Sequence, residues 1–184
     1  MNWTSCLRGV GIAAFAAMTS LSASETFAKH QDLSIKVIYG EDDRLDLYEV
    51  QDQTLRDLAA STMALMRASD VTINGSVAHI VEDPIGEAYG LCQDEPYYNQ
   101  NSAAFCSGFL VGADTVVTAG HCVRSQSSCD STRFVFGFAM NSSDDKANQV
   151  PANNVYECKE LVHSVAVGSG EDFAVIKLNR PVLD

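Results

Sequence analysis

The stretch TVVTAGHCV, residues 115–123, combines an apolar strand, a turn of small residues, and a histidine beside a cysteine. Residues 115–118 are rich in β-branched side chains, which favour strands. Ala119 and Gly120 then supply a turn, and His121 and Cys122 follow it. Because the chain has only 4 histidines, the position of this one at the end of a strand singles it out as a candidate functional residue.

The residues before this stretch extend it into a predicted β-hairpin. Phe105–Val111 is a second apolar run, and the segment 112–114 has the composition of a turn. Cys106 and Cys122 stand at the two ends of this hairpin. Since a hairpin brings its ends together, the pattern predicts a Cys106–Cys122 disulfide, worth about 3 kcal/mol for a loop of this size. The disulfide would also hold His121 in place, as a general base requires.

The rest of the chain predicts an all-β fold, either a barrel or a sandwich. The polar segments 93–103 and 141–153 are predicted to be exposed loops. Apolar residues at helical spacing predict one short helix over Asp52–Ala60, and Ser61–Met66 either continues it or begins a strand. The predicted strands are Phe105–Val111, Thr115–Thr118, Arg133–Met140, Asn154–His163 and Phe173–Leu178.

Composition restricts the classes of function. A chain of 184 residues is usually one domain or slightly more. Its net charge of −12 argues against a nucleic-acid partner, because nucleic-acid binding needs a basic face. The acidic residues are spread along the chain, which is typical of a solvated surface.

The N-terminus has the layout of a secretory signal peptide. Arg8 precedes an apolar run from Val10 to Met18, and small residues follow up to a predicted cleavage after Ala28, with Leu21-Ser22-Ala23 as a second option. The apolar run is too short for a membrane span, so no membrane partner is predicted. Residues 1–28 are therefore predicted to be removed, which makes the protein secreted or periplasmic.

Export makes the cysteines candidates for disulfides. Cys6 would leave with the signal peptide, and the five that remain are an odd number, so one should lack a partner within the chain. The alternative is a zinc site at Cys106, His121, Cys122 and Cys129. We do not predict it, because the chain has no CxxC pair and adjacent His121 and Cys122 are poorly placed to bind one metal ion. No cofactor is predicted.

A histidine that acts as a base works best with a buried carboxylate beside it. Asp172 directly precedes the apolar strand 173–178, where a poorly solvated carboxylate needs a partner. The alternatives are that Asp172 only begins the strand, or that Glu171 is the partner of His121. The other histidines, His30, His79 and His163, are interpreted as structural.

The TAGHC motif at 118–122, with CSG upstream at 106–108 and DFAVIKLNRPV downstream at 172–182, is similar to the first half of trypsin-like (chymotrypsin-fold) serine proteases. The resemblance covers about residues 100–184. It implies an antiparallel β-barrel, the first of two, with a protein or peptide substrate. It also implies that His121 is the general base and that Asp172 is the acid that orients it.

The nucleophilic serine of that family, in a Gly-Asp-Ser-Gly-Gly turn, has no counterpart among these residues, which contain no G-x-S-x-G motif. Ser107 corresponds to a strand serine that the family does not use as nucleophile. Two functions remain: a secreted serine endopeptidase, seen here as an incomplete chain that is inactive alone, or a non-enzymatic protease-like β-domain.

A further disulfide inside the barrel is predicted between Cys129 and Cys158, which leaves Cys92 to pair outside this chain.

A weaker match lies upstream. The stretch KVIYGEDDRLDLYEV, residues 36–50, resembles the start of the mature chain in bacterial glutamyl endopeptidases. The match implies a short propeptide over 29–36, with the protease domain over 37–184.

Overall fold

The computed structural model describes residues 43–168 and 170–182. The chain divides into two compact units, Met1–Arg44 and Leu45–Asp184, and every element below belongs to the second. The predicted signal peptide over 1–28 and propeptide over 29–36 lie outside the described residues and stay predictions.

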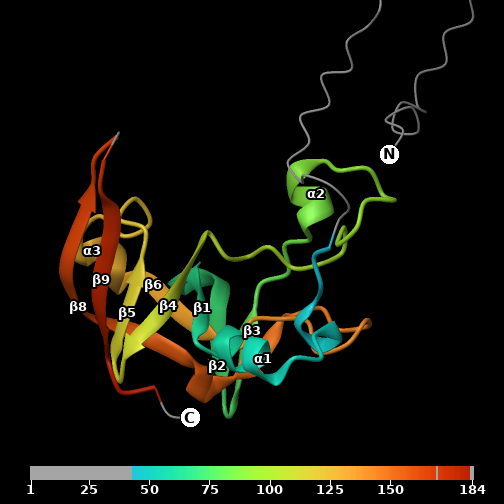
Figure 1. The fold of residues 1–184 in the computed structure, drawn as a ribbon, viewed down its shortest axis with the longest axis horizontal. Coiled ribbons are helices and arrows are strands. Elements are labelled where there is room, and N and C mark those ends of the chain that lie inside the picture. Colours follow the sequence, from blue (N-terminus) through green and yellow to red (C-terminus); the bar gives the residue numbers. More distant parts are fainter. Residues whose placement is uncertain (1–42, 169, 183–184) are drawn as a thin grey trace, which may run out of the picture. The chain divides into compact units, whose positions relative to one another are not determined.

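Six strands of this unit close into an antiparallel barrel, in the spatial order β1-β4-β5-β9-β8-β6 (Figure 1). The predicted trypsin-like barrel is therefore confirmed. Closure leaves no free strand edge around the barrel. The strands are β1 (Thr62–Arg67), β4 (Cys106–Gly112), β5 (Thr115–Thr118), β6 (Thr132–Phe136), β8 (Val155–Ala166) and β9 (Asp172–Leu178).

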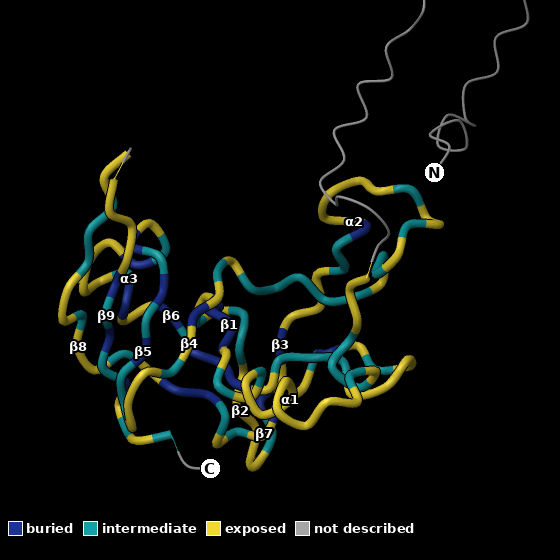
Figure 2. Tube along the Cα trace, viewed as in Figure 1, coloured by how far each residue is buried: buried dark blue, intermediate teal, exposed yellow. Residues whose placement is uncertain are grey.

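The barrel interior is filled by alternate residues of its strands, as the two-residue period of a strand requires. Figure 2 shows these positions as the buried parts of the strands. One polar side chain joins them: the buried Thr118 hydroxyl donates a hydrogen bond to the carbonyl oxygen of Ser107 at 2.7 Å. The buried interior consists of Met63, Leu65, Val116, Val123, Cys129, Phe134, Phe136, Tyr156, Ala174, Ile176 and Leu178.

A second, smaller sheet of three strands packs against the outside of the barrel. Its order is β2-β3-β7, formed by Val71–Asn74, Val77–Ile80 and Gln149–Pro151. It makes a second core with outward-facing residues of β1, β6 and β8, so β1 is buried on both faces. This core consists of Ala64, Met66, Ala78, Ile80, Val135, Val150 and Val155.

This sheet was not predicted from the sequence, although one sequence signal for it is present. Asn74-Gly75 lies between β2 and β3, and Asn-Gly is a strong hairpin signal. Gly75 has a φ of 61°, in the left-handed region that residues with a side chain rarely adopt. Strand β7 lies inside the segment 141–153 that was predicted to be a loop, so that prediction was wrong over residues 149–151.

The predicted helix is confirmed as α1 (Gln53–Ala60). Asp52 caps it, because its carboxylate accepts hydrogen bonds from the amides of Thr54 at 2.8 Å and Leu55 at 3.3 Å. Residues after Ser61 begin strand β1 and do not continue the helix. The structure adds short helices that the sequence did not predict: α2 (Ile85–Tyr89), α3 (Gln126–Asp130), and the 3₁₀ turns η2 (Leu47–Glu49), η3 (Ala68–Asp70) and η4 (Ala152–Asn154).

Two predicted strands have different ends in the structure. The strand predicted over Arg133–Met140 ends at Phe136, because Gly137 has a φ of 73° and turns the chain away. The strand predicted over Asn154–His163 extends to Ala166 as β8 and pairs with β9 as far as Asp172. The added residues Ser164, Val165 and Ala166 pair with the first three residues of β9.

Both predicted disulfides are present. Cys106–Cys122 has a Cα separation of 6.2 Å, and Cys129–Cys158, which joins α3 to β8, has one of 5.5 Å. Cys92 is also in a disulfide, whose partner lies outside the described residues. The described residues do not identify that partner, so the prediction that Cys92 pairs outside this chain stays a prediction.

None of the helices in the described part of the chain has the length and apolar character needed to span a bilayer.

Candidate active site

The turn that follows β5, residues 119–123, carries His121 and is called the histidine turn below. Its backbone closes through a hydrogen bond from the Cys122 amide to the Ala119 carbonyl at 3.1 Å. The Cys106–Cys122 disulfide ties the turn to the start of β4. The hairpin predicted from the sequence therefore supports His121 from one side.

Strand pairing brings Asp172 to the same place. Thr118, the last residue of β5, pairs with Ala174 of β9, so the end of β5 lies beside the start of β9. Asp172 is the first residue of β9. Its carboxylate therefore reaches the histidine turn although the two residues are 51 positions apart in the sequence.

One carboxylate contacts His121 at two points. The His121 amide donates a hydrogen bond to Asp172 Oδ1 at 2.9 Å, and the ring Nδ1 lies 2.6 Å from Asp172 Oδ2. An ionised carboxylate only accepts hydrogen bonds, so Nδ1 must carry the proton. The tautomer selected in this way leaves Nε2 with a free lone pair, which is the form that a general base needs.

The pair is accessible from solvent. The His121 side chain is 56% exposed and that of Asp172 is 38% exposed. The His121 ring is therefore open to an approaching group, while the Asp172 carboxylate is more enclosed. Glu171, the alternative partner in the sequence, is exposed, and the carboxylate that contacts His121 is that of Asp172.

The hydrogen bond from the His121 ring, followed by that from the His121 amide, lowers the pKa of Asp172 below its ordinary value of 3.8, against an opposing effect of partial burial. A pKa that is lower in the folded state contributes stability above about pH 4, and this contribution is lost as the pH falls through the folded-state pKa. We expect a ¹³C NMR titration of the Asp172 carboxyl to give a midpoint below 3.8.

The same titration in His121→Ala is the control, because that variant removes the ring hydrogen bond and the midpoint should move back toward the ordinary value. A wild-type midpoint at or above 3.8 would contradict the contact.

The remaining histidines of the described residues lie elsewhere. His163 packs its ring against Phe173, with ring centroids 5.4 Å apart. His79 lies in β3 of the smaller sheet. His30 lies outside the described residues. Within the described residues, neither His79 nor His163 forms the pair of hydrogen bonds to one carboxylate that His121 forms.

Two contacts that fix the histidine turn against β8 were not predicted from the sequence. Gly120 lies against the backbone of β8, where a Cβ atom would overlap the carbonyl oxygen of Val165. The Ser164 hydroxyl donates to the backbone of the histidine turn. The small residue before His121 was a signal for the first, but no sequence feature distinguishes Ser164 from the other serines.

Three potential metal ligands lie close together at this site. Within the described residues, the ligand atoms of Cys106, His121 and Cys122 lie within 4.8 Å of one another. The two sulfur atoms are joined to each other, and zinc binds cysteine as the thiolate. The trio therefore does not fit a zinc site while the disulfide is intact.

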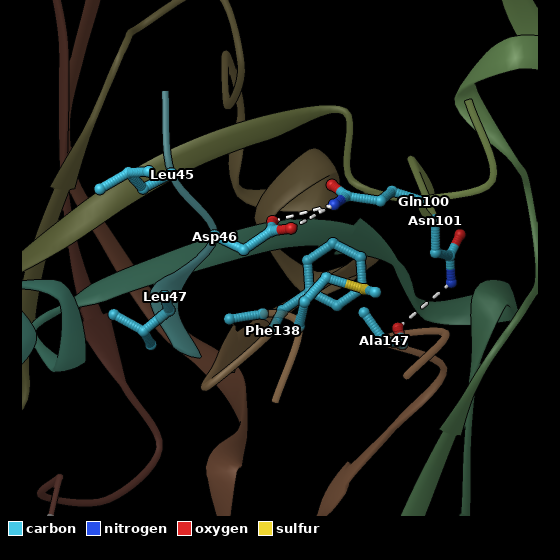
Figure 3. Close-up of a pocket in the computed structure, with 9 residues that line it drawn as sticks. Leu45, Asp46, Leu47, Gln100, Asn101, Phe138 and Ala147 are labelled. Atoms are coloured by element: carbon cyan, nitrogen blue, oxygen red, sulfur yellow. Dashed lines mark hydrogen bonds between the residues drawn. The ribbon is translucent and has the colours of Figure 1, made fainter. Parts of the chain in front are cut away.

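Cavities lie in the described part of the chain in addition to the His121–Asp172 pair. One of about 530 Å³ adjoins Cys122 and is lined also by Arg67, Phe105 and hydroxyl residues of α3 and β6. Another, of about 220 Å³, is lined by residues of 45–47, 100–101, 138–140 and 147 (Figure 3). In the second, the Gln100 amide donates to both oxygens of Asp46 at 2.9 Å, so its main polar groups already satisfy each other.

Comparison with known families agrees with this geometry. The family model named Trypsin matches residues 92–183, which is half of the chain and contains both His121 and Asp172. The chain belongs to the trypsin family. This trypsin-family chain is also similar to a protein named extracellular metalloprotease from Bacillus subtilis (strain 168), with 35% identity over 83 residues. The match covers 45% of this chain and only 26% of that protein's length.

Proposed function

We propose that this trypsin-family chain carries the base and the orienting acid of a secreted serine endopeptidase. The observation that carries the proposal is the double contact of Asp172 with the ring and the amide of His121, at 2.6 and 2.9 Å. His121 is the general base, and Asp172 is the residue that orients it and stabilises the imidazolium. Membership of a protease family supports a protein or peptide substrate.

The proposed reaction begins at the unprotonated Nε2 of His121. This nitrogen takes the proton of a serine hydroxyl as the serine oxygen attacks the peptide carbonyl carbon. The resulting imidazolium is stabilised by the Asp172 carboxylate, and it returns the proton to the amine that leaves. A water molecule then repeats the sequence to release the acyl group.

The nucleophile is proposed to come from outside these 184 residues, because they contain no G-x-S-x-G motif. Ser107 is a poor candidate, since it lies within β4 and pairs with Ala64 of β1. The donors that would stabilise the oxyanion are proposed to accompany the nucleophile.

An apolar strip on the outer face of the barrel supports this proposal. The strip consists of Phe109, Val111, Val117, Val175 and Phe173. Cross-strand pairing places Phe109 beside Val117 and Val117 beside Val175, so it crosses β4, β5 and β9. Phe109 is 51% exposed and Val111 54%. Exposed apolar surface of this kind indicates an interaction face, and Phe173 places the strip next to Asp172.

Export is part of the proposal. It is supported by the signal-like residues 1–28, by the two disulfides between described cysteines, and by the word extracellular in the name of the similar protein. Disulfides of this kind persist in oxidising compartments.

We expect the 184-residue chain alone to hydrolyse neither casein nor short ester substrates above the buffer rate, because it lacks a nucleophile for His121 to activate. A protein extended by its downstream coding sequence, with a Gly-Asp-Ser-Gly-Gly-like turn, should be active. A sulfonyl fluoride that modifies serine should abolish that activity, whereas a metal chelator should leave it.

Each other outcome identifies an alternative. Activity of the 184-residue chain that disappears in His121→Ala would show a nucleophile among these residues. Sensitivity of the extended protein to the chelator alone would favour a metalloprotease, as the similar protein is named. No serine turn and no activity would favour the non-enzymatic β-domain.

A further inference from the structure

We propose that Ser164 is a positioning residue that holds the histidine turn against β8. Its hydroxyl lies 2.8 Å from the carbonyl oxygen of Val123 and 3.4 Å from that of Gly120. These two carbonyls lie on opposite sides of His121 in the sequence. The mechanistic value of this role rests on the proposed function, but the contact itself does not.

The position of Ser164 follows from the register of the barrel. Ser164 pairs with Ala174 of β9, and Ala166 of the same strand pairs with Asp172. β8 therefore passes directly beside the histidine turn as well as beside the strand that carries the orienting carboxylate. The carbonyl of Val165, the next residue, faces Gly120.

A hydroxyl has one proton, so Ser164 donates to one carbonyl at a time. The bond to Val123 is the shorter one. Val123 is fully buried in the barrel core, with 0% exposure, and a buried carbonyl that loses its donor is destabilised because water does not replace the bond. Ser164 therefore holds the histidine turn at its C-terminal end, from which the chain continues to α3.

Three strands then hold His121, and each holds a different part of it. β4 holds the turn through the Cys106–Cys122 disulfide. β9 holds the ring and amide through Asp172. β8 holds the backbone that follows His121 through the bond from Ser164 to the Val123 carbonyl. Since both of these hydrogen-bond acceptors are backbone carbonyls, Ser164 acts through the placement of His121 and not on a reacting atom.

The experiment is amide hydrogen exchange by NMR on the full chain, read at His121, whose amide donates to Asp172. Ser164→Ala should speed exchange of this amide about fivefold, which corresponds to the loss of one ordinary hydrogen bond. Ser164→Thr keeps the hydroxyl and should restore slow exchange. Exchange at Ile176 in the core reports global unfolding, and the local rate is compared with it.

Ser102→Ala is the matched control, because the Ser102 hydroxyl also donates to a backbone carbonyl, that of Asp83 at 2.8 Å. It should leave His121 exchange unchanged. The ¹³C titration midpoint of Asp172 gives a second readout, and it should rise in Ser164→Ala and not in Ser102→Ala. If Ser164→Ala does not fold, Ser164→Cys replaces it, since a thiol is a weak donor of similar size.

The proposal is overturned if Ser164→Ala leaves His121 exchange unchanged, or if Ser102→Ala accelerates it equally. Neither readout uses a substrate or a nucleophile. A failure of the proposed function, such as full activity of His121→Ala in an extended protein, would therefore leave this result intact. Conversely, unchanged exchange in Ser164→Ala would remove the positioning role without affecting the roles of His121 and Asp172.

Discussion

Replacement of His121 with alanine in the extended, serine-bearing protein should lower kcat by about 10⁶, since loss of the base costs nearly as much as loss of a whole triad. Asp172→Asn should lower kcat by about 10⁴, because the imidazole then loses the acceptor that selects its tautomer. In this structure that acceptor is Asp172 Oδ2, 2.6 Å from Nδ1. KM should change much less than kcat in both variants, because neither side chain is proposed to bind substrate.

Glu171→Gln is the matched control for Asp172→Asn. Glu171 is the adjacent carboxylate, and it is exposed. The Glu171→Gln variant should therefore retain nearly full kcat. The double variant His121→Ala with Asp172→Asn should be hardly slower than His121→Ala alone, since the two residues act as a unit. Effects that multiply in the double variant, or equal losses in Glu171→Gln and Asp172→Asn, would contradict the assigned roles.

Gly120→Ala should destabilise the fold by about 3 kcal/mol or more, at the upper end for overpacking. A Cβ atom at this position would overlap the carbonyl oxygen of Val165 and lie 2.9 Å from that of Phe173. Both obstacles are backbone atoms of paired strands, so neither can turn aside as a flexible side chain would. The measurement is the free energy of unfolding in urea, in parallel with secretion yield.

Gly168→Ala provides the comparison, because a Cβ atom there meets nothing within 4 Å. Gly168 lies in the connection between β8 and β9, and the Gly168→Ala variant should show little loss of stability. If Gly120→Ala is as stable as Gly168→Ala, the close approach of the histidine turn to β8 does not exist in solution. If it folds but the His121 amide exchanges rapidly, the strain has displaced the turn instead.

The local sequence pattern was sufficient to predict those elements that are formed by residues close together in the sequence. The hairpin 105–118 was predicted because its strands are joined by a short turn, and its disulfide followed because a hairpin returns to its start. The α1 helix followed from apolar spacing that begins after a capping aspartate. The short smaller sheet was missed although Asn74-Gly75 marked its hairpin, because its third strand, β7, joins from about seventy residues away and carries no distinct pattern.

The sequence by itself determined that this chain forms an antiparallel barrel of the trypsin type and that His121 and Asp172 are its candidate site. Those features depend on side-chain alternation, turns and a specific motif, all of which lie within short segments. Only the tertiary structure decided that Asp172 contacts both the ring and the amide of His121, that Gly120 must lack a side chain, and that Ser164 reaches the histidine turn. These contacts join β5, β8 and β9, and their register is set by closure of the whole barrel. Because one residue of slip would turn every side chain to the opposite face, no local segment contains that information.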